Sequence, residues 1–256
     1  MTDEKRMIRF RKQRANDLRT IAKTLDGVFG SERGVPNIKT TPLLTAAKNL
    51  EDGIIGYKMM EGSKWGYEIL DFKFPVETIR HIRPKVIKKV ELTLNMRLEA
   101  DIDDWGTLND PLLCLNFNVV LKAITDKNNY LCFHIDKHDM SKFSTEPHPI
   151  YHIQYNPKPK FVSDADFDYG NVLHFDTPRI MHQPLDFILG LGFLISNFAP
   201  SRWPKLIEDR FFKQAYLEYQ QNILKPYNHS LANHWPPMVS EDVTWNATNH
   251  ICPFIV

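Results

Sequence analysis

The sequence is poor in cysteine and glycine, and it contains no long apolar run. Its three cysteines, Cys114, Cys132 and Cys252, have no metal-ligand spacing, which argues against a disulfide framework and fits a reducing compartment. No window approaches ~18 consecutive apolar residues, and the charged start of the chain carries no apolar signal stretch. We therefore expect a cytoplasmic protein without a membrane segment. Zinc-finger spacing, a glycine-rich phosphate loop and an aromatic RNA-binding strand motif are also absent, so no motif names a function.

The composition is that of a chain with a substantial core. Of the 256 residues, 43% are apolar and 25% are charged, which is enough to bury a core without disulfides. An aromatic content of 12%, with 17 prolines against 11 glycines, is typical of aromatic-rich strands joined by stiff loops. Because no repeat or flexible linker interrupts the pattern, we expect residues 1–256 to form a single α+β domain.

Residues 1–50 are expected to form a helical N-terminal region. Apolar residues recur at helical spacing between about residues 5 and 28, which predicts an amphipathic helix with a basic outer face. These residues are Ile8, Ala15, Leu18, Ala22, Leu25 and Phe29. Farther along, Thr41 and Pro42 have the pattern of an N-cap followed by proline at the first helical position, so a short second helix is expected through Leu50.

Residues 54–176 carry the periodicity of an antiparallel sheet. Apolar and polar residues alternate along several segments, so each strand buries one face and exposes the other. The first two segments predict a hairpin, and the next three predict an antiparallel meander. In chain order the expected strands are 54–60, 64–74, 89–102, 113–123, 130–136, 150–155 and 172–176.

Residues 184–226 return to helical patterns, and residues 227–256 are expected to form an irregular tail. The first helix would contain about 15 residues that are apolar on nearly all sides, which indicates a core helix too short to span a bilayer. Gly190 and Gly192 within it indicate close packing rather than a nucleotide-binding turn. Pro204 opens a second helix that ends before the tail. We expect the helices of both chain ends to pack on one face of the sheet.

The small net charge of +1 hides an uneven distribution. Residues 1–97 contain 20 Lys and Arg against 12 Asp and Glu, a net charge of +8, whereas the remaining residues contain 12 against 19, a net charge of −7. Two basic runs stand out, Lys5, Arg6, Arg9, Arg11, Lys12, Arg14 and Arg19, then Arg80, Arg83, Lys85, Lys88 and Lys89. Such runs can bind phosphates, and we take Arg11, Arg14, Lys88 and Lys89 as candidate nucleic-acid contacts. Alternatively, the two halves of the fold neutralise each other.

Six of the ten histidines fall within a short stretch of the chain. They are His134, His138, His148, His152, His174 and His182. Strand alternation places His134 with Asp136 on the polar face of one strand, and His152 with Gln154 on the polar face of the next. If these strands are neighbours, His134 is expected to lie opposite His152.

This histidine-rich face is compatible with catalysis. The candidate metal ligands, for zinc or manganese with a position left open for water, are His134, Asp136, His152 and His174. Because histidine transfers protons near neutral pH, His134, His152 and His174 are also candidate catalytic groups. Arg179 would supply a fixed cation for a phosphate or carboxylate, and Gln154 a binding contact. Two other interpretations stay open: a structural cluster of mutually bonded side chains, or a pocket without chemistry.

Three segments form a C-terminal pattern: HPIYHIQ (148–154), PRI (178–180) and PLDFILGLGFLISNF (184–198). Together they resemble an uncharacterised bacterial family in which an HPxxH strand precedes an RIP-type segment and an apolar helix ending in Asn-Phe. This chain departs from that pattern in the order of Pro178 and Arg179 and in a long acidic loop before them. The resemblance covers about 50 residues and singles out His148, His152, Arg179 and Asn197. It implies a bacterial cytoplasmic protein from an antiviral defence or mobile-element locus, without a particular activity.

Two functions follow from these patterns. The first is an accessory or recognition subunit of a bacterial multi-protein system, which would bind a protein or nucleic-acid partner through the basic N-terminal face. The second is a metal- or histidine-dependent phosphoester hydrolase or nuclease acting at the histidine-rich face. The first requires an exposed basic or apolar patch, whereas the second requires imidazole nitrogens that converge on one point.

Overall fold

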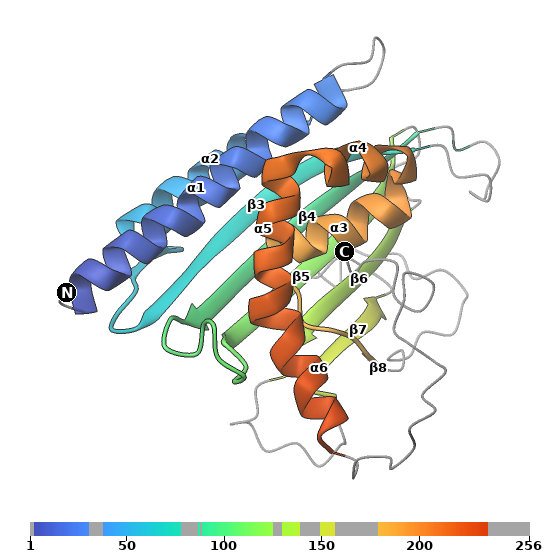
Figure 1. Ribbon diagram of the computed structural model, residues 1–256. Coiled ribbons are helices and arrows are strands. Elements are labelled where there is room, and N and C mark those ends of the chain that lie inside the picture. The colour runs from blue at the N-terminus through green and yellow to red at the C-terminus, as the bar shows by residue number, and fades with distance from the viewer. Residues whose placement is uncertain are drawn as a thin grey trace.

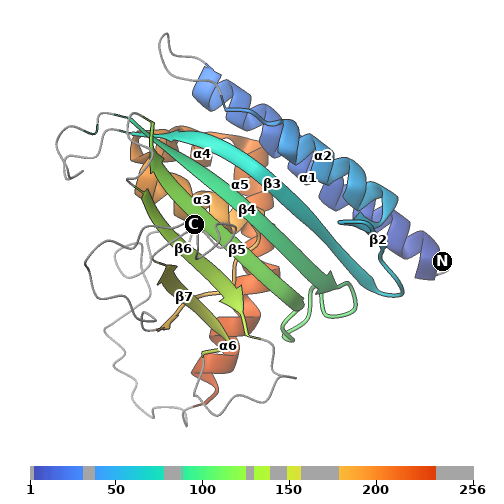
Figure 2. The same ribbon diagram turned by 180° about the vertical axis from the view of Figure 1, so that it is seen from behind.

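The computed structural model describes residues 3–30, 38–77, 87, 89–124, 130–138, 149–156 and 179–234. They form a six-stranded antiparallel sheet with helices from both ends of the chain packed against it (Figure 1). From behind, the strands lie in front of the C-terminal helices (Figure 2). The expected α+β fold with an antiparallel meander is confirmed.

The N-terminal region forms α1 (Asp3–Gly30) and α2 (Thr41–Asp52), which run along the β3 edge of the sheet in both views (Figures 1 and 2). The apolar stripe of α1 is buried as expected from Ala15 to Phe29, but Ile8 is exposed and Met7 is buried instead. Thr41 is not the N-cap of α2 but its first residue, because Thr40 takes the flanking position and its hydroxyl donates to Asp26 instead of capping the helix. α2 ends at Gly53, whose φ of 72° is left-handed and favours glycine.

The sheet is a meander in which the strands follow chain order. Its strands are β3 (Lys64–Val76), β4 (Val90–Asp101), β5 (Leu112–Ala123), β6 (Tyr130–Lys137), β7 (Tyr151–Asn156) and β8 (Ile180–Met181). Alternate residues of β4 are buried, as the alternating sequence predicts. The apolar side chains of this face share one core cluster with those of α1, α2, α3 and α5.

Two expectations about strands differ from the structure. The segment 54–60 does not pair with 64–74; instead β1 (Ile54–Ile55) folds back on β2 (Lys58–Met59), and β3 pairs with β4. The tight turn between β1 and β2 is possible because Gly56 adopts a left-handed φ of 59°, which glycine tolerates. The expected strand 172–176 lies outside the described residues, and the edge strand next to β7 is β8.

The C-terminal region packs on the apolar face of the sheet. Its elements are α3 (Phe187–Phe198), η2 (Pro200–Arg202), α4 (Trp203–Glu208), α5 (Arg210–Tyr219), η3 (Gln220–Leu224) and α6 (Lys225–Ala232). A Cβ on Gly190 would lie 2.3 Å from the Phe117 ring, and one on Gly192 would lie 2.7 Å from Tyr216. The expected role of both glycines in close packing is therefore confirmed.

The expected irregular tail is wrong for its first residues. The helix does not stop at Pro226 but continues through Ala232. Proline is tolerated there because it lies in the first turn of α6, directly after the π-helical turn η3, where its missing N–H costs no regular helical bond. Residues 235–256 lie outside the described ranges. In the part of the chain that is described, no helix has both the length and the apolarity to cross a membrane.

Candidate functional site

The histidine-rich face forms where β6 and β7 pair, but in a register that differs from the expected one. His134 lies opposite Gln154, and Asp136 lies opposite His152. The expected pairing of His134 with His152 is therefore wrong by two residues. This shift keeps every side chain on its expected face, because alternation repeats every two residues. His134 and His152 are still diagonal neighbours, with ring centroids 6.0 Å apart.

Polar neighbours satisfy His134 on this face. The Nδ2 of Asn156 lies 2.8 Å from Nδ1 of His134, and Asp136 Oδ2 lies 3.6 Å from Nε2. If the amide donates to Nδ1, a neutral imidazole carries its proton on Nε2, toward Asp136. The side chains of His134, His152 and Gln154 are all buried. For His134, this arrangement matches the structural interpretation, in which polar side chains bond to one another.

The structure assembles only part of the expected metal-ligand set. It brings His134, Asp136 and His152 to one face, whereas His174 lies outside the described ranges. Within those ranges, no three His, Cys, Asp or Glu side chains are grouped closely enough to hold a metal ion. The described residues therefore offer no support for a zinc or manganese centre.

Other residues that the sequence singled out are dispersed. Arg179 directly precedes β8, where Met181 lies opposite His152, so it belongs to the same edge of the sheet. Asn197 belongs to α3 and donates to the Phe193 carbonyl at 2.7 Å, so it acts within its own helix. His182 contacts the Gln183 carbonyl, and burial lowers the pKa of its imidazole. His148 lies outside the described residues.

The candidate nucleic-acid contacts Arg11 and Arg14 do not lie on the outer face of α1. Arg11 is half-buried and donates to the carbonyls of Met60 and Lys64. Arg14 is only 1% exposed. Lys89 is exposed directly before β4, and Lys88 lies outside the described residues. Arg14 is therefore inaccessible to phosphates, and the guanidinium of Arg11 is engaged by two backbone carbonyls.

Arg14 sits inside a box of aromatic rings and carboxylates. Its guanidinium carbon lies 5.2–5.3 Å from the ring centroids of Phe10, Trp105 and Tyr219. Its nitrogens lie 3.2 Å from Asp17 and 2.6 Å from Glu218. Cation–π and ion-pair contacts together compensate for the loss of water around the charge. Burial raises the pKa of Asp17 to about 6, although Arg14 acts in the opposite direction.

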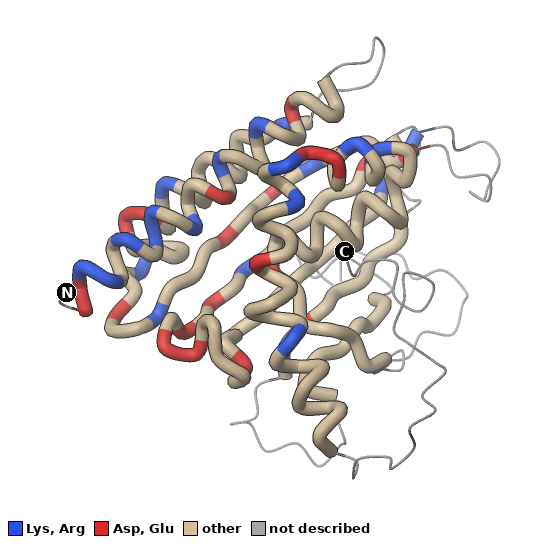
Figure 3. Tube along the Cα trace, viewed as in Figure 1, with Lys and Arg blue, Asp and Glu red and all other residues tan. Residues whose placement is uncertain are grey.

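The outer side of α1 carries instead a row of cations, which we call the cationic stripe: Lys5, Arg9, Lys12, Arg19 and Lys23. With Asn16, successive positions are separated by 4, 3, 4, 3 and 4 residues, so all lie in one narrow sector of the helix. Figure 3 shows basic segments recurring along α1. Among the described residues, the stripe forms one ion pair, between Arg19 and Glu51. The sequence signal that finds this stripe is its spacing of three and four residues.

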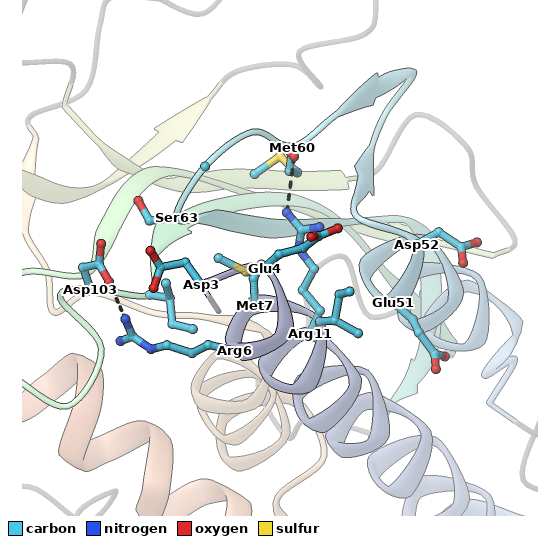
Figure 4. A pocket seen from close by; sticks show the side chains of 13 residues that line it. Asp3, Glu4, Arg6, Met7, Arg11, Glu51, Asp52, Met60, Ser63 and Asp103 are labelled. Carbon is cyan, nitrogen blue, oxygen red and sulfur yellow. Dashed lines mark hydrogen bonds and ion pairs between the residues drawn. The ribbon is translucent and has the colours of Figure 1, made fainter. Parts of the chain in front are cut away.

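The N-terminal end of the stripe borders a hollow of about 820 Å³ (Figure 4). Five carboxyl groups line it, those of Asp3, Glu4, Glu51, Asp52 and Asp103. Its two arginines are engaged, since Arg6 pairs with Asp103 at 2.8 Å and Arg11 donates to the Met60 carbonyl (Figure 4). This acidic end disfavours an anion, so an anionic partner would be held mainly by the rest of the stripe.

Comparison with protein-family models, curated proteins and solved structures gives no match.

Proposed function

We propose that this protein is a recognition module that binds nucleic acid along the cationic stripe of α1. The observation that supports this proposal is the alignment of five cations on the exposed side of a 28-residue helix. Four of them, Lys5, Arg9, Lys12 and Lys23, are exposed. Cations in this setting bind phosphates with release of the counterions around the nucleic acid.

The length of the stripe fits a linear polyanion. From Lys5 to Lys23 the helix rises about 27 Å at ~1.5 Å per residue. A duplex carries one phosphate charge per ~1.7 Å of its axis, so several phosphates fall within that distance. A membrane-surface helix would need an apolar face to insert into lipid. In α1 that face is buried in the core, which favours nucleic acid over a bilayer.

The histidine-rich face supports the hydrolase less well. His134, His152 and Gln154 are buried there, Asn156 contacts His134, and no metal-binding group of three occurs among the described residues. Binding without chemistry is therefore the function that the described geometry favours.

The test is a salt titration of binding to a labelled oligonucleotide of about 20 nucleotides. Wild-type protein is expected to bind at about 50 mM salt and to weaken steeply as salt increases. The double variant Arg9→Glu, Lys12→Glu should bind at least about 10-fold more weakly, with a salt slope smaller by roughly 1 to 2, because two phosphate contacts are lost.

The matched control is Lys58→Glu with Lys122→Glu, which makes the same change of charge at exposed lysines of β2 and β5. It should bind nearly as wild type. Equal loss of affinity in both double variants would mean that binding depends on net charge and not on the stripe. A wild-type protein that ignores DNA and RNA at low salt, or that binds anionic vesicles instead, would overturn the proposal.

A further inference from the structure

A groove lies beside the C-terminal half of the cationic stripe, where α4 and α5 approach α1. Its volume is about 600 Å³. One wall is formed by α1 with Asn16, Thr20, Lys23 and Gly27, and the other by Lys205, Asp209 and Phe211. The hydroxyl of Thr24 donates to Asp209 Oδ1 at 3.3 Å and joins the two walls. The groove thus continues the stripe, since Lys23 belongs to both and Asn16 lies in the same sector of α1.

Phe211 is the unusual residue of this groove. Its side chain is 64% exposed, whereas that of the adjacent Phe212 is fully buried. The difference follows from the helical period, which turns Phe212 toward the core with Tyr216 and leaves Phe211 outside. An exposed ring next to cations is the arrangement on which single-stranded nucleic acids stack their bases.

The charges around Phe211 match such a ligand. Lys23 and Lys205 line the groove, and Arg210 and Lys213 are exposed on α5 outside its lining. Figure 3 shows these basic segments of α4 and α5 close to those of α1. A carboxylate also lines the groove, because Asp209 caps α5 by accepting from the Phe212 amide at 2.8 Å. That carboxylate repels phosphate, so the groove itself suits a base and the surrounding cations suit the backbone.

The groove is also open enough for a base. A Cβ built on Gly27 would meet no atom within 4 Å. Its volume falls in the range of about 300–1,000 Å³ that is usual for small-molecule sites, so one nucleobase can enter.

We infer that this groove binds a base of a single-stranded nucleic acid, stacked on Phe211, while the stripe holds the neighbouring phosphates. This inference rests on the proposed function and adds the strand state of its ligand. Single strands are preferred over duplexes because only an unpaired base can leave its stack and reach the ring.

Three ligands of one length separate base contact from charge: a single strand, its duplex, and a single strand without bases. Wild type should bind the single strand at least about 10-fold more tightly than the abasic strand or the duplex. Phe211→Leu keeps apolar bulk but removes the ring, and it should weaken single-strand binding about 10-fold while leaving abasic binding unchanged. Phe211→Trp should retain binding, and the fluorescence of its indole should be quenched by the single strand only.

A second variant blocks the groove without touching Phe211. Gly27→Leu places a side chain in the open space of the groove and favours the helix, so the fold is maintained. It should reduce single-strand binding and leave abasic binding intact.

The inference would be overturned if wild type bound the abasic and the base-containing strand with equal affinity. It would also be overturned if Phe211→Leu bound the single strand as tightly as wild type. The proposed function would then stand if Arg9→Glu, Lys12→Glu still lost binding. Failure of wild type to bind any of the three ligands would overturn both. If the protein bound anionic vesicles alone, and Phe211→Leu weakened that binding, the ligand would be a lipid surface instead.

Discussion

The histidine-rich face of the sheet and the cationic stripe of α1 are both unusual in composition, yet they differ in how their charges and polar groups are used. On the sheet, His134 is bonded by Asn156 and approached by Asp136. Along the stripe, the described residues form an ion pair only with Arg19. Composition therefore does not decide which surface is available to a partner. The local supply of opposite charges and hydrogen-bond partners does.

The same contrast occurs within α1 itself. Arg9 and Arg14 belong to one basic run, but Arg9 is exposed and Arg14 lies inside the aromatic and carboxylate box. Their expected contributions are opposite: Arg9 to binding and Arg14 to stability. Substitutions that treat the two arginines alike can test this division.

Arg14→Ala should produce the largest loss of stability. Removing the guanidinium leaves Asp17 and Glu218 without their cation and opens a cavity between three rings, which should lower the free energy of unfolding by about 3–5 kcal/mol. Arg9→Ala is the matched control and should change it by no more than about 0.5 kcal/mol. Urea denaturation of both variants measures the difference. Similar midpoints would show that the box contributes no special stability.

Asp186→Asn should change the pH dependence of stability. Asp186 is fully buried, caps α3 through the Leu189 amide and accepts from the Tyr67 hydroxyl. Burial raises its pKa to about 6, above about 3.9 in an unfolded chain. The folded state therefore holds an extra proton between these values, and stability falls as pH rises from about 4 to 6, by up to about 3 kcal/mol for this group.

The asparagine cannot titrate, so the variant should lose much of this slope. Thermal unfolding between pH 4 and pH 7 measures it for both proteins. Asp17, with a pKa also raised to about 6 by burial, contributes a slope of the same sign that remains in the variant. A variant whose stability varies with pH as steeply as wild type would contradict the assignment to Asp186.

His134→Ala should have a smaller effect on stability, about 1–2 kcal/mol, because it leaves the Asn156 amide without its partner.

Elemental analysis of untagged wild-type protein should show no stoichiometric metal. If wild type bound zinc or manganese in a one-to-one ratio and the double variant His134→Ala, His152→Ala did not, the hydrolase would become the favoured function. Nucleic-acid binding is expected to be unchanged in both variants.

Charge reversal on the stripe should have the smallest effect on stability. Arg9→Glu, Lys12→Glu should unfold within about 0.5 kcal/mol of wild type, since neither side chain has an ion pair among the described residues. Its effect should appear in binding alone. A marked loss of stability would mean that the stripe has a structural role.

Much of the fold follows from local periodicity. The alternation in β4 and the apolar stripe of α1 predict their elements correctly, because the backbone of a strand or helix fixes which side chains share a face. The close packing at Gly190 and Gly192 was also predictable, since small residues within an apolar helix indicate an approaching neighbour.

The candidate site was less predictable. Alternation determined that His134 and His152 share a face but not their register, which depends on how β6 and β7 match along their whole length. From the sequence, Arg14 belongs to a basic run and is expected to face solvent. Only the tertiary structure supplies Trp105, Tyr219 and Glu218, which make its burial favourable.

The sequence by itself therefore determined most of the elements, their faces and the cations of α1, because these depend on residues close together in the chain. Tertiary structure alone decided which cations are buried and which are exposed, the strand register, and the groove between α1 and α5. These features depend on partners more than 80 residues apart in several cases, such as Arg14 with Glu218 or Thr24 with Asp209. No local pattern encodes such contacts, because residues that are distant in the chain come together only when the core forms.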